Sequence, residues 1–290
     1  MRCNICGSAS IGPLNGDGEF PACAACGSEL RQRAVALLLS RALFGCDIAL
    51  CDFPQLKSIR GLGISDLPML ARPLERFFTY TNTYYHQEPS LDLTEPPPPE
   101  LGLFDFLICS EVLEHVMSPV SRAFEALSRL LKPTGFLLLT VPFGLGEQTE
   151  DHFPTATALK VTEVDGKLVA VGHYPDGSYR VHDNLVFHGG HGATLELRLF
   201  SENELKSQLA FAGFTHVSFL CEGNENFGVA FPSPCSLPIL ASKTELTLIR
   251  PALAELVQSF ATQEVIIRAA AGSKWLRLGR ALGLGPRLGQ

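Results

Sequence analysis

The sequence predicts an α/β fold built on a doubly wound, mostly parallel sheet, and residues 104–142 carry most of that prediction. Residues 104–109 and 136–141 are short, predominantly apolar runs, and residues 120–131 between them repeat apolar side chains every three to four positions. Strands buried on both faces read as near-continuous apolar runs, and strand, helix and strand in this order form a parallel crossover. The segment Lys132-Pro133-Thr134-Gly135 is expected to break the helix before the second strand.

Polar side chains follow the first of these strands at the point where it ends. They are Ser110, Glu111, Glu114 and His115. Ligands of open α/β sheets bind outside the carboxyl ends of the strands. We therefore expect the functional site at this edge of the sheet.

Length and composition describe a globular protein. The chain has 290 residues, of which 46% are hydrophobic and 18% charged, so it is long enough for one large domain with small appendages. The net charge of −7 argues against a non-specific nucleic-acid binder, which would carry a basic face. The first ten residues hold no apolar signal segment, and no apolar run reaches the ~20 residues that span a bilayer. We expect a cytoplasmic protein.

Two matched cysteine pairs stand at the start of the chain. Cys3 and Cys6 form one CxxC motif, Cys23 and Cys26 form the other, and a glycine follows each pair. CxxC spacing lets two thiolates bind one ion, and four cysteine ligands make a closed, structural zinc site. A redox dithiol or a chance cluster is the alternative. A module of residues 1–28 is too small to fold on its apolar core alone, so bound zinc would supply its folding energy.

The expected domain organisation follows from these features. Ser28 is expected to cap the next helix, in which Arg31 and Arg33 form either a clamp for phosphate or carboxylate groups or ion pairs to the main domain. The expected parts are a zinc ribbon at 1–28, a linker helix at 29–46, a main domain at 47–250 with an insertion at 143–199, and a helical tail at 251–290.

The motifs LEHV, LLKPTG and FLLLTVPF, in this order, resemble the fourth and fifth strands of class I S-adenosylmethionine-dependent methyltransferases. The resemblance extends over residues 47–242. It implies a Rossmann-like sheet of seven strands, which residues 214–220 and an antiparallel strand at 227–231 would complete. It also implies S-adenosylmethionine as the cofactor and a methyl acceptor as the substrate.

The same resemblance implies a set of cofactor-binding residues. Residues 58–66 are similar to the family's glycine-rich turn after the first strand, with Gly61 and Gly63 in place, Ser65 at the third glycine position, and Asp66 next to it. Arg60 stands near the place where the family has an acidic residue.

The remaining cofactor residues come from later strands. Asn82 is the nearest candidate for the ribose hydroxyls, with a turn residue as the alternative. Asp92 and Leu93 match the loop that meets the adenine amino group, while Ser110 and Glu111 would lie beside the methionine end.

Three histidines are candidates for a general base. His115 has a reference pKa near 6.5 and can accept a proton at neutral pH, or it fixes its loop by hydrogen bonds together with Glu114. The insertion at 143–199, with hairpin signals at Asp165-Gly166 and Asp176-Gly177, is expected to cover the acceptor pocket. It contains His152, His182, His188 and His191, and of these His188 and His191 are the candidates. A plain lid, acid–base chemistry and a second metal site all stay open.

The sequence therefore favours a methyltransferase acting on a small polar or sugar-containing acceptor. A non-catalytic scaffold with an altered glycine turn is the first alternative, and a zinc-ribbon RNA methyltransferase is the second. From Arg268 onward the tail has five Lys and Arg residues and no acidic residue. Such a tail can contact an anionic membrane surface or a protein partner. Its ending is similar to tails of bacterial proteins in surface-polysaccharide synthesis.

Overall fold

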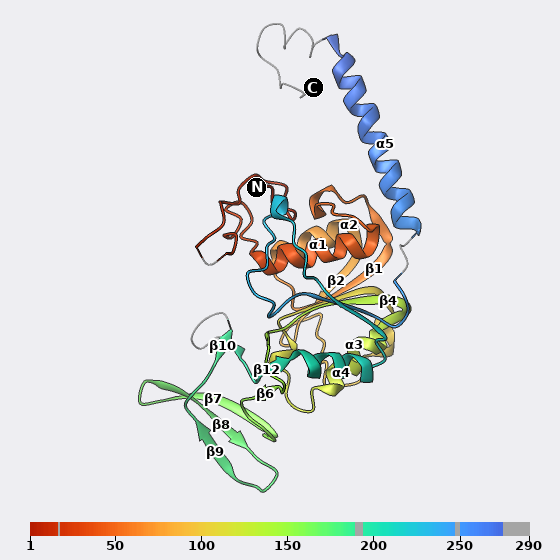
Figure 1. The fold of residues 1–290 in the computed structure, drawn as a ribbon. Helices are drawn as coiled ribbons and strands as arrows, with labels where there is room; N and C mark the ends of the chain where they lie inside the picture. The colour runs from red at the N-terminus through yellow and green to blue at the C-terminus, as the bar shows by residue number, and fades with distance from the viewer. Residues whose placement is uncertain (17, 189–193, 247–249, 275–290) are drawn as a thin grey trace.

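The computed structural model describes residues 1–16, 18–188, 194–246 and 250–274 (Figure 1). A central sheet of six strands has the order β13-β14-β4-β3-β1-β2. The strands β1 to β4 are parallel to one another, β14 runs antiparallel to its neighbours β4 and β13, and β13 therefore has the direction of β1 to β4. The bounds are β1 Leu56–Ile64, β2 Phe78–Thr83, β3 Phe104–Ser110, β4 Leu131–Thr140, β13 His216–Phe219 and β14 Ile239–Ser242. The predicted fold class is confirmed.

Helices cover both faces of this sheet (Figure 1). Alternate residues of β3 point to opposite faces, so Phe106 and Ile108 belong to one core cluster and Leu107 and Cys109 to another. The first cluster is shared with α1 Leu30–Phe44 and α2 Pro68–Phe77, and the second with α3 Ser121–Leu130 and α4 Glu202–Phe211. The N-terminal module adds its own apolar side chains to the first cluster, so its packing is continuous with that of the main domain.

The far edge of the sheet differs from the prediction in two respects. Among the described residues the sheet has six strands instead of seven. The last strand is β14, whereas residues 227–231, where the last strand was predicted, contain the end of the 3-10 turn Glu225–Phe227. The Asn224 side chain accepts a hydrogen bond from the Asn226 amide, and Gly228 adopts a φ of 65°, so the chain turns here and cannot extend.

Two local features also differ. Residues 132–135 belong to β4 and do not form a separate helix-breaking segment before that strand. Helix α1 is capped by a reciprocal pair of hydrogen bonds between Glu29 and Gln32, and not by Ser28, whose hydroxyl lies 3.2 Å from the Cys3 sulfur. Helix α4 begins with a side-chain cap, because the Ser201 hydroxyl accepts a hydrogen bond from the Glu204 amide.

The insertion forms three small sheets. Strands β7 Ala158–Val164, β8 Lys167–His173 and β9 Tyr179–His182 make one sheet, which extends away from the central sheet in Figure 1. Both predicted hairpins are present. Strands β5 Phe143–Gly144, β12 Arg198–Ser201 and β6 Glu150–Asp151 form the second sheet, and β10 Phe187–His188 pairs with β11 Thr194–Leu195.

The last helix among the described residues is α5 Arg250–Gly272, which leads away from the sheet (Figure 1). The helix predicted from residue 251 to about 280 is present from Arg250 to Gly272, and the described residues continue to 274. Residues 275–290, which carry most of the basic tail, lie outside the described residues. In the described part of the chain, no helix combines the length and the apolar character that a membrane span requires.

Candidate functional site

The four predicted zinc ligands meet at one point. The sulfur atoms of Cys3, Cys6, Cys23 and Cys26 all lie within 4.8 Å of one another. Two of the separations, Cys3 to Cys26 and Cys6 to Cys23, are 3.8 Å. A tetrahedral zinc ion with Zn–S bonds of about 2.3 Å holds its sulfurs ~3.8 Å apart. The cluster therefore fits a structural zinc ion, and its closed set of thiolates leaves no position for a substrate.

The two cysteine turns have the same backbone geometry, as their sequences predict. In one, the Gly7 amide donates to the Cys3 carbonyl, and in the other the Gly27 amide donates to the Cys23 carbonyl. Both glycines have φ near 80°, at 80° and 75°, which a side chain would strain. The following glycine in each motif is thus required by the turn itself.

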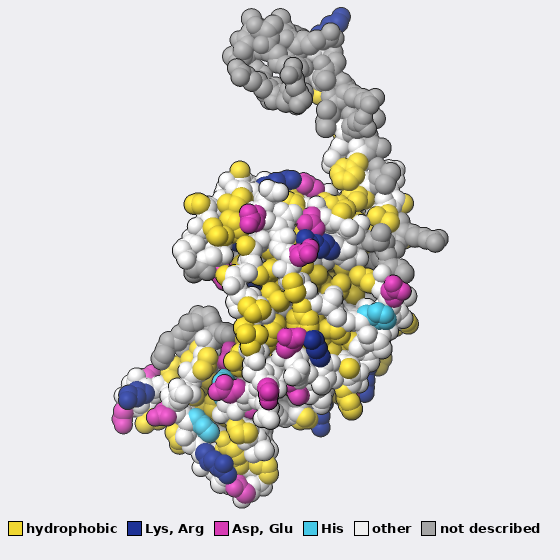
Figure 2. Space-filling view, in the orientation of Figure 1, with side chains coloured by type: hydrophobic (Ala, Val, Ile, Leu, Met, Phe, Trp, Pro, Cys, Tyr) yellow, Lys and Arg dark blue, Asp and Glu magenta, His cyan; other side chains and the backbone are white. Residues whose placement is uncertain are grey.

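A cleft of about 520 Å³ lies at the carboxyl ends of β3 and β4. Glu111 and Thr140 form its floor at the sheet edge, and Arg31 lies at the start of α1. The N-terminal module contributes residues such as Phe20, and the segment 231–238 contributes the remaining side. In the space-filling view, hydrophobic side chains gather on the middle of the visible face, between the N-terminal module and the insertion (Figure 2).

Two polar contacts join the ends of these strands. The Ser110 and Thr140 hydroxyl oxygens lie 2.8 Å apart. Directly after Ser110, Glu111 has a φ of 55°, and its carboxylate lies 3.0 Å from the Arg31 guanidinium. A left-handed φ at a non-glycine residue is costly and occurs most often at functional sites. Arg31 thus forms the ion pair to the main domain that was one of its two predicted roles.

The predicted glycine turn lies inside a strand. Gly61 and Gly63 belong to β1, and the turn that follows consists of Ser65 and Asp66. A side chain at Gly61 would meet the Phe106 ring 2.3 Å away, so this glycine is required by packing between neighbouring strands. The prediction that residues 58–66 form a glycine-rich turn is therefore wrong for residues 58–64, which belong to β1.

Asp66 is the centre of a buried polar cluster. Its side chain accepts a hydrogen bond from the Tyr80 hydroxyl, and the Asn82 side chain bonds both the Asp66 amide and the Asp66 carbonyl, at 3.0 and 2.9 Å. Asp66 and Asn82 are 5% and 6% exposed. Burial raises the pKa of Asp66 to about 7, against the hydrogen bond from Tyr80, which lowers it. Both predicted cofactor residues are engaged within the protein.

The other predicted cofactor residues lie further along the same edge. The Asp92 carboxylate caps its own turn, accepting hydrogen bonds from the Thr94 amide and hydroxyl at 2.8 and 2.7 Å. Leu93 is buried at 4% exposure and packs in the core under α3. The adenine-binding role of Asp92 and Leu93 stays a prediction.

Of the predicted bases, His115 has the clearest geometry. Its Nδ1 lies 2.8 Å from the Leu195 carbonyl oxygen, and since that oxygen only accepts, Nδ1 carries the proton. Its Nε2 lies 3.5 Å from the Glu114 carboxylate. These contacts tie the loop after β3 to the insertion. His188 belongs to β10, and His191 lies outside the described residues.

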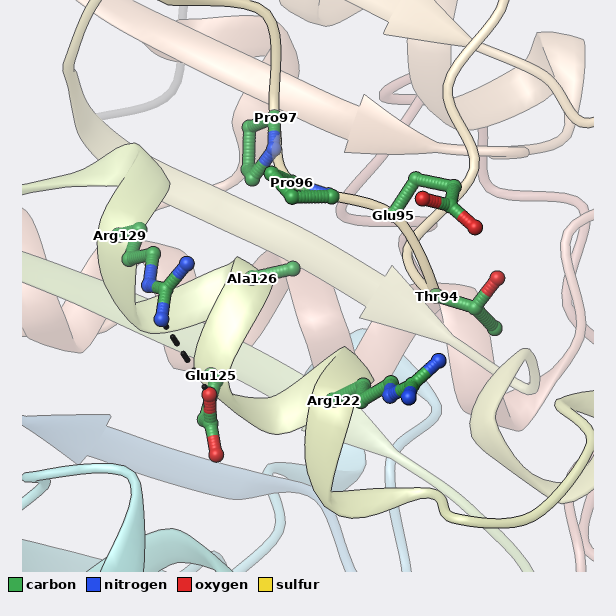
Figure 3. A pocket seen from close by; sticks show the side chains of 8 residues that line it. All are labelled: Thr94, Glu95, Pro96, Pro97, Arg122, Glu125, Ala126 and Arg129. Atoms are coloured by element: carbon green, nitrogen blue, oxygen red, sulfur yellow. Dashed lines mark hydrogen bonds and ion pairs between the residues drawn. The ribbon is translucent and has the colours of Figure 1, made fainter.

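A second cleft, of about 330 Å³, lies on the outer side of α3 (Figure 3). Residues 94–97 line one side of it, and Arg122, Glu125 and Arg129 line the other. Arg129 pairs with Glu125 at 3.4 Å, and both side chains are largely exposed. This cleft contains none of the predicted site residues, although Thr94 donates hydrogen bonds to the Asp92 carboxylate.

Sequence reasoning missed two parts of the cleft at the sheet edge. Thr140 ends β4 as Ser110 ends β3, so the rule that located Ser110 would also have located Thr140. The predicted last strand, residues 227–231, includes only the first residue of segment 231–238, and the rest of this segment carries no chemical motif. Its place beside the N-terminal module depends on contacts between residues about 200 positions apart.

Comparisons with known proteins agree with this fold. A family model described as a methyltransferase domain matches residues 44–218. A search of curated proteins finds no match.

Three solved structures are similar to the chain. The sugar N-methyltransferase KedS8 from Streptoalloteichus sp ATCC 53650 has 15% identity and a TM-score of 0.43, over 74% of this chain and 87% of that one. The 1,6-didemethyltoxoflavin-N1-methyltransferase of Burkholderia thailandensis has 15% identity and a TM-score of 0.43, over 77% of this chain and 82% of that one. CalS10, an amino pentose methyltransferase from Micromonospora echinaspora, has 15% identity and a TM-score of 0.42, over 75% of this chain and 93% of that one. Likenesses at this level say nothing about the acceptor of this chain.

Proposed function

We propose, from the premise that the chain belongs to the methyltransferase domain family, that it transfers the methyl group of S-adenosylmethionine to a small polar acceptor. The observation that carries the proposal is the cleft of about 520 Å³ at the carboxyl ends of β3 and β4. Clefts of roughly 300–1,000 Å³ take small ligands, and the carboxyl edge of a parallel sheet is where such ligands bind. Methyl transfer is an in-line displacement, so the protein chiefly aligns donor and acceptor.

The lining of the cleft favours a neutral or amine-bearing acceptor with hydroxyl groups, such as a sugar. Glu19, Glu29 and Glu111 line it together with a single cation, Arg31. Carboxylates and hydroxyls hydrogen-bond sugar hydroxyls and amines, and the negative charge of the carboxylates repels the phosphates of nucleic acid. This lining and the net charge count against an RNA acceptor. A role in surface-polysaccharide synthesis rests only on the ending of the tail.

S-Adenosylmethionine supplies the methyl group when it is bound, and Ser110 and Glu111 are the residues best placed to contact its methionine end. Asp92 has a second carboxylate oxygen that is not used in its turn, and this oxygen is our candidate acceptor for the adenine amino group. Residues 61–66 fit the cofactor less well, because Asp66 and Asn82 bond each other and the glycines serve packing. No base is assigned at this segment.

A general base is proposed on the acceptor side. His115 holds its Nδ1 proton on the Leu195 carbonyl, so deprotonated Nε2 would be the basic atom of the neutral ring. His188 and His191 stay alternatives, together with a plain lid that does no chemistry. Zinc at the four cysteines has a structural role in this proposal, and we place the protein in the cytoplasm.

A non-catalytic scaffold is the second candidate, and the buried cluster of Asp66, Tyr80 and Asn82 favours it. These side chains stand where the family resemblance would put the nucleoside, and they bond one another, although one Asp66 carboxylate oxygen is buried without a hydrogen-bond partner among the described residues. A protein of this kind would keep the sheet and the cleft for ligand binding without the methyl donor.

Calorimetric titration with S-adenosylmethionine and S-adenosylhomocysteine separates the two candidates. A dissociation constant well below 1 mM supports the enzyme, and one weaker than ~1 mM, which is about −4 kcal/mol, supports the scaffold. Asp92→Ala is expected to weaken cofactor binding while the circular dichroism spectrum stays unchanged. Unchanged affinity in this variant would remove the adenine assignment without removing the enzyme.

A further inference from the structure

Arg33 joins two parts of the chain that are far apart in sequence. Its side chain is fully buried at 0% exposure. The guanidinium donates to four backbone carbonyls: to Ser28 at 2.6 Å, to Pro21 at 3.1 Å, to Phe20 at 3.1 Å and to Gly228 at 3.0 Å. No acidic side chain is among these acceptors. A buried charge is tolerated only when it is well hydrogen-bonded, and here the backbone supplies the partners.

Three of these carbonyls belong to the N-terminal module, and they frame its second cysteine pair. Phe20 and Pro21 come just before Cys23, and both also line the cleft at the sheet edge. Ser28 follows Cys26, and its hydroxyl oxygen lies 3.3 Å from that cysteine's sulfur. The segment that holds the metal ligands is therefore the segment that forms one wall of the cleft.

The fourth carbonyl leads to the opposite wall. Gly228 lies three residues before Phe231, where the cleft-lining segment 231–238 begins. The backbone at Gly228 approaches the module closely, because a side chain there would meet Ile11 at 2.9 Å. A second backbone contact, from the Arg2 amide to the Asn226 carbonyl at 3.1 Å, runs parallel to it. The two walls thus meet at Arg33.

We propose that Arg33 is a positioning residue through which the zinc-bound module and the segment 231–238 are held together as the two walls of the cleft. A guanidinium has five N–H donors in a fixed fork and can bond all four carbonyls, whereas an ammonium group has three donors on one nitrogen. Without the metal, the turns that present the Phe20, Pro21 and Ser28 carbonyls lose their support. Arg33 then loses three of its four acceptors, and the segment 231–238 loses its anchor.

This inference goes beyond methyl transfer, since it concerns how the cleft is built. It rests on the proposed function only in taking the cleft as the acceptor site. The coupling between metal and cleft is measurable without any methyl donor or acceptor. If the protein does not transfer methyl groups, the coupling between metal and cleft can still hold. If the coupling is absent, methyl transfer is not contradicted.

Hydrogen exchange followed by mass spectrometry tests the coupling on the full chain. The samples are the zinc-loaded protein, the same protein after chelation, and the variants Arg33→Met and Arg31→Met, with zinc content measured in each. Arg31 is the matched control, because it lies on the same helix and bonds Glu111 instead of the module. Arg33→Lys keeps the positive charge, and it replaces Arg33→Met in the experiment if Arg33→Met does not fold.

Chelation is expected to speed amide exchange in residues 226–238 by at least ~10-fold, while peptides from β3 and β4 keep their protection. Zinc-loaded Arg33→Met, or Arg33→Lys in its place, is expected to give the same increase in residues 226–238, and Arg31→Met is not. The inference is overturned if chelation leaves residues 226–238 unchanged, if the Arg33 variant and Arg31→Met give the same exchange, or if the purified protein holds no zinc.

Discussion

The Arg31 guanidinium lies 3.0 Å from the Glu111 carboxylate, and this ion pair joins the start of α1 to the carboxyl end of β3 across the cleft. Glu111 reaches that position through a left-handed φ of 55°, with its amide bonded to the Thr140 carbonyl at 2.8 Å. Strain of this kind persists only when the surrounding structure fixes it. A ligand that enters the cleft meets this pair at the sheet edge.

Glu111→Gln is therefore expected to weaken binding of S-adenosylhomocysteine by about tenfold, because a hydrogen bond to a charged group contributes ~1.5 kcal/mol or more. Stability should fall by less than ~1 kcal/mol, since the Arg31 and Glu111 side chains are 38% and 17% exposed and solvent screens the pair. Calorimetry and urea unfolding measure the two quantities. Arg31→Met is the control, because it removes the ion-pair partner of Glu111 and keeps the Glu111 carboxylate. If wild type and Glu111→Gln bind S-adenosylhomocysteine with equal affinity, Glu111 is excluded from the cofactor site.

Cys23→Ser is expected to reduce the zinc content from one ion per chain and to lower the melting temperature, because the module has too small a core of its own and metal binding supplies folding energy. Cys46→Ser is the control, since Cys46 is an exposed free cysteine outside the metal cluster. Zinc release with a colorimetric chelator and thermal unfolding check both variants. If Cys23→Ser kept a full complement of zinc and an unchanged melting temperature, the cluster would have another role.

These two sites show what the sequence can and cannot predict. The cysteine ligands are predictable because each CxxC turn is local, and a glycine at the same place in both copies confirms the turn. The parallel strands are predictable because burial on both faces leaves a continuous apolar run. Arg31 was placed on the correct helix, but the choice between clamp and ion pair depended on Glu111, which is 80 positions away.

The altered cofactor segment shows the limit more sharply. Two glycines spaced as in the family motif suggested a loop, yet β1 continues through both of them to Ile64. The reason lies in the Phe106 ring, which a neighbouring strand places against Gly61. A residue pattern along one segment carries no information about a side chain from another strand, so a glycine needed for packing and a glycine needed for a ligand look alike.

Asp66 makes the stability of the protein depend on pH. Burial raises its pKa from 3.8 to about 7, so the folded state holds the proton more tightly than the unfolded state does. The resulting stabilisation is complete below pH ~4 and is lost at about 1.4 kcal/mol per pH unit as the pH rises to ~7. The asparagine of Asp66→Asn stays neutral at every pH. The free energy of unfolding of this variant, relative to wild type, should therefore rise by roughly 2–3 kcal/mol from pH 5 to pH 8.

Urea unfolding of both proteins at pH 5 and pH 8 measures this difference. Asp92→Asn is the control, because Asp92 caps a half-buried turn and is not fully buried as Asp66 is. The Tyr80 hydroxyl, which donates to Asp66, can donate equally to the asparagine oxygen, so the variant keeps the buried hydrogen bond. A difference between Asp66→Asn and wild type that is the same at both pH values would show that Asp66 does not titrate in this range.

Gly61→Ala separates the packing role of this glycine from a ligand role. The new methyl group would lie 2.3 Å from the Phe106 ring, which is packed against Phe78 and Phe136 and cannot move freely. Overpacking should cost about 1–3 kcal/mol, and Phe106→Leu should return part of that loss when the two changes are combined.

Gly63→Ala is the matched control for this pair of changes, because its methyl group would meet Tyr80 and Asp66 instead of Phe106. Phe106→Leu should not rescue it. Urea unfolding gives the coupling energy, and titration with S-adenosylhomocysteine gives the function of the glycine. If Gly61 serves packing alone, the double variant Gly61→Ala with Phe106→Leu binds as the wild type does. If stability returns and affinity does not, the backbone at Gly61 contacts the cofactor, and the strand has to open there to admit it.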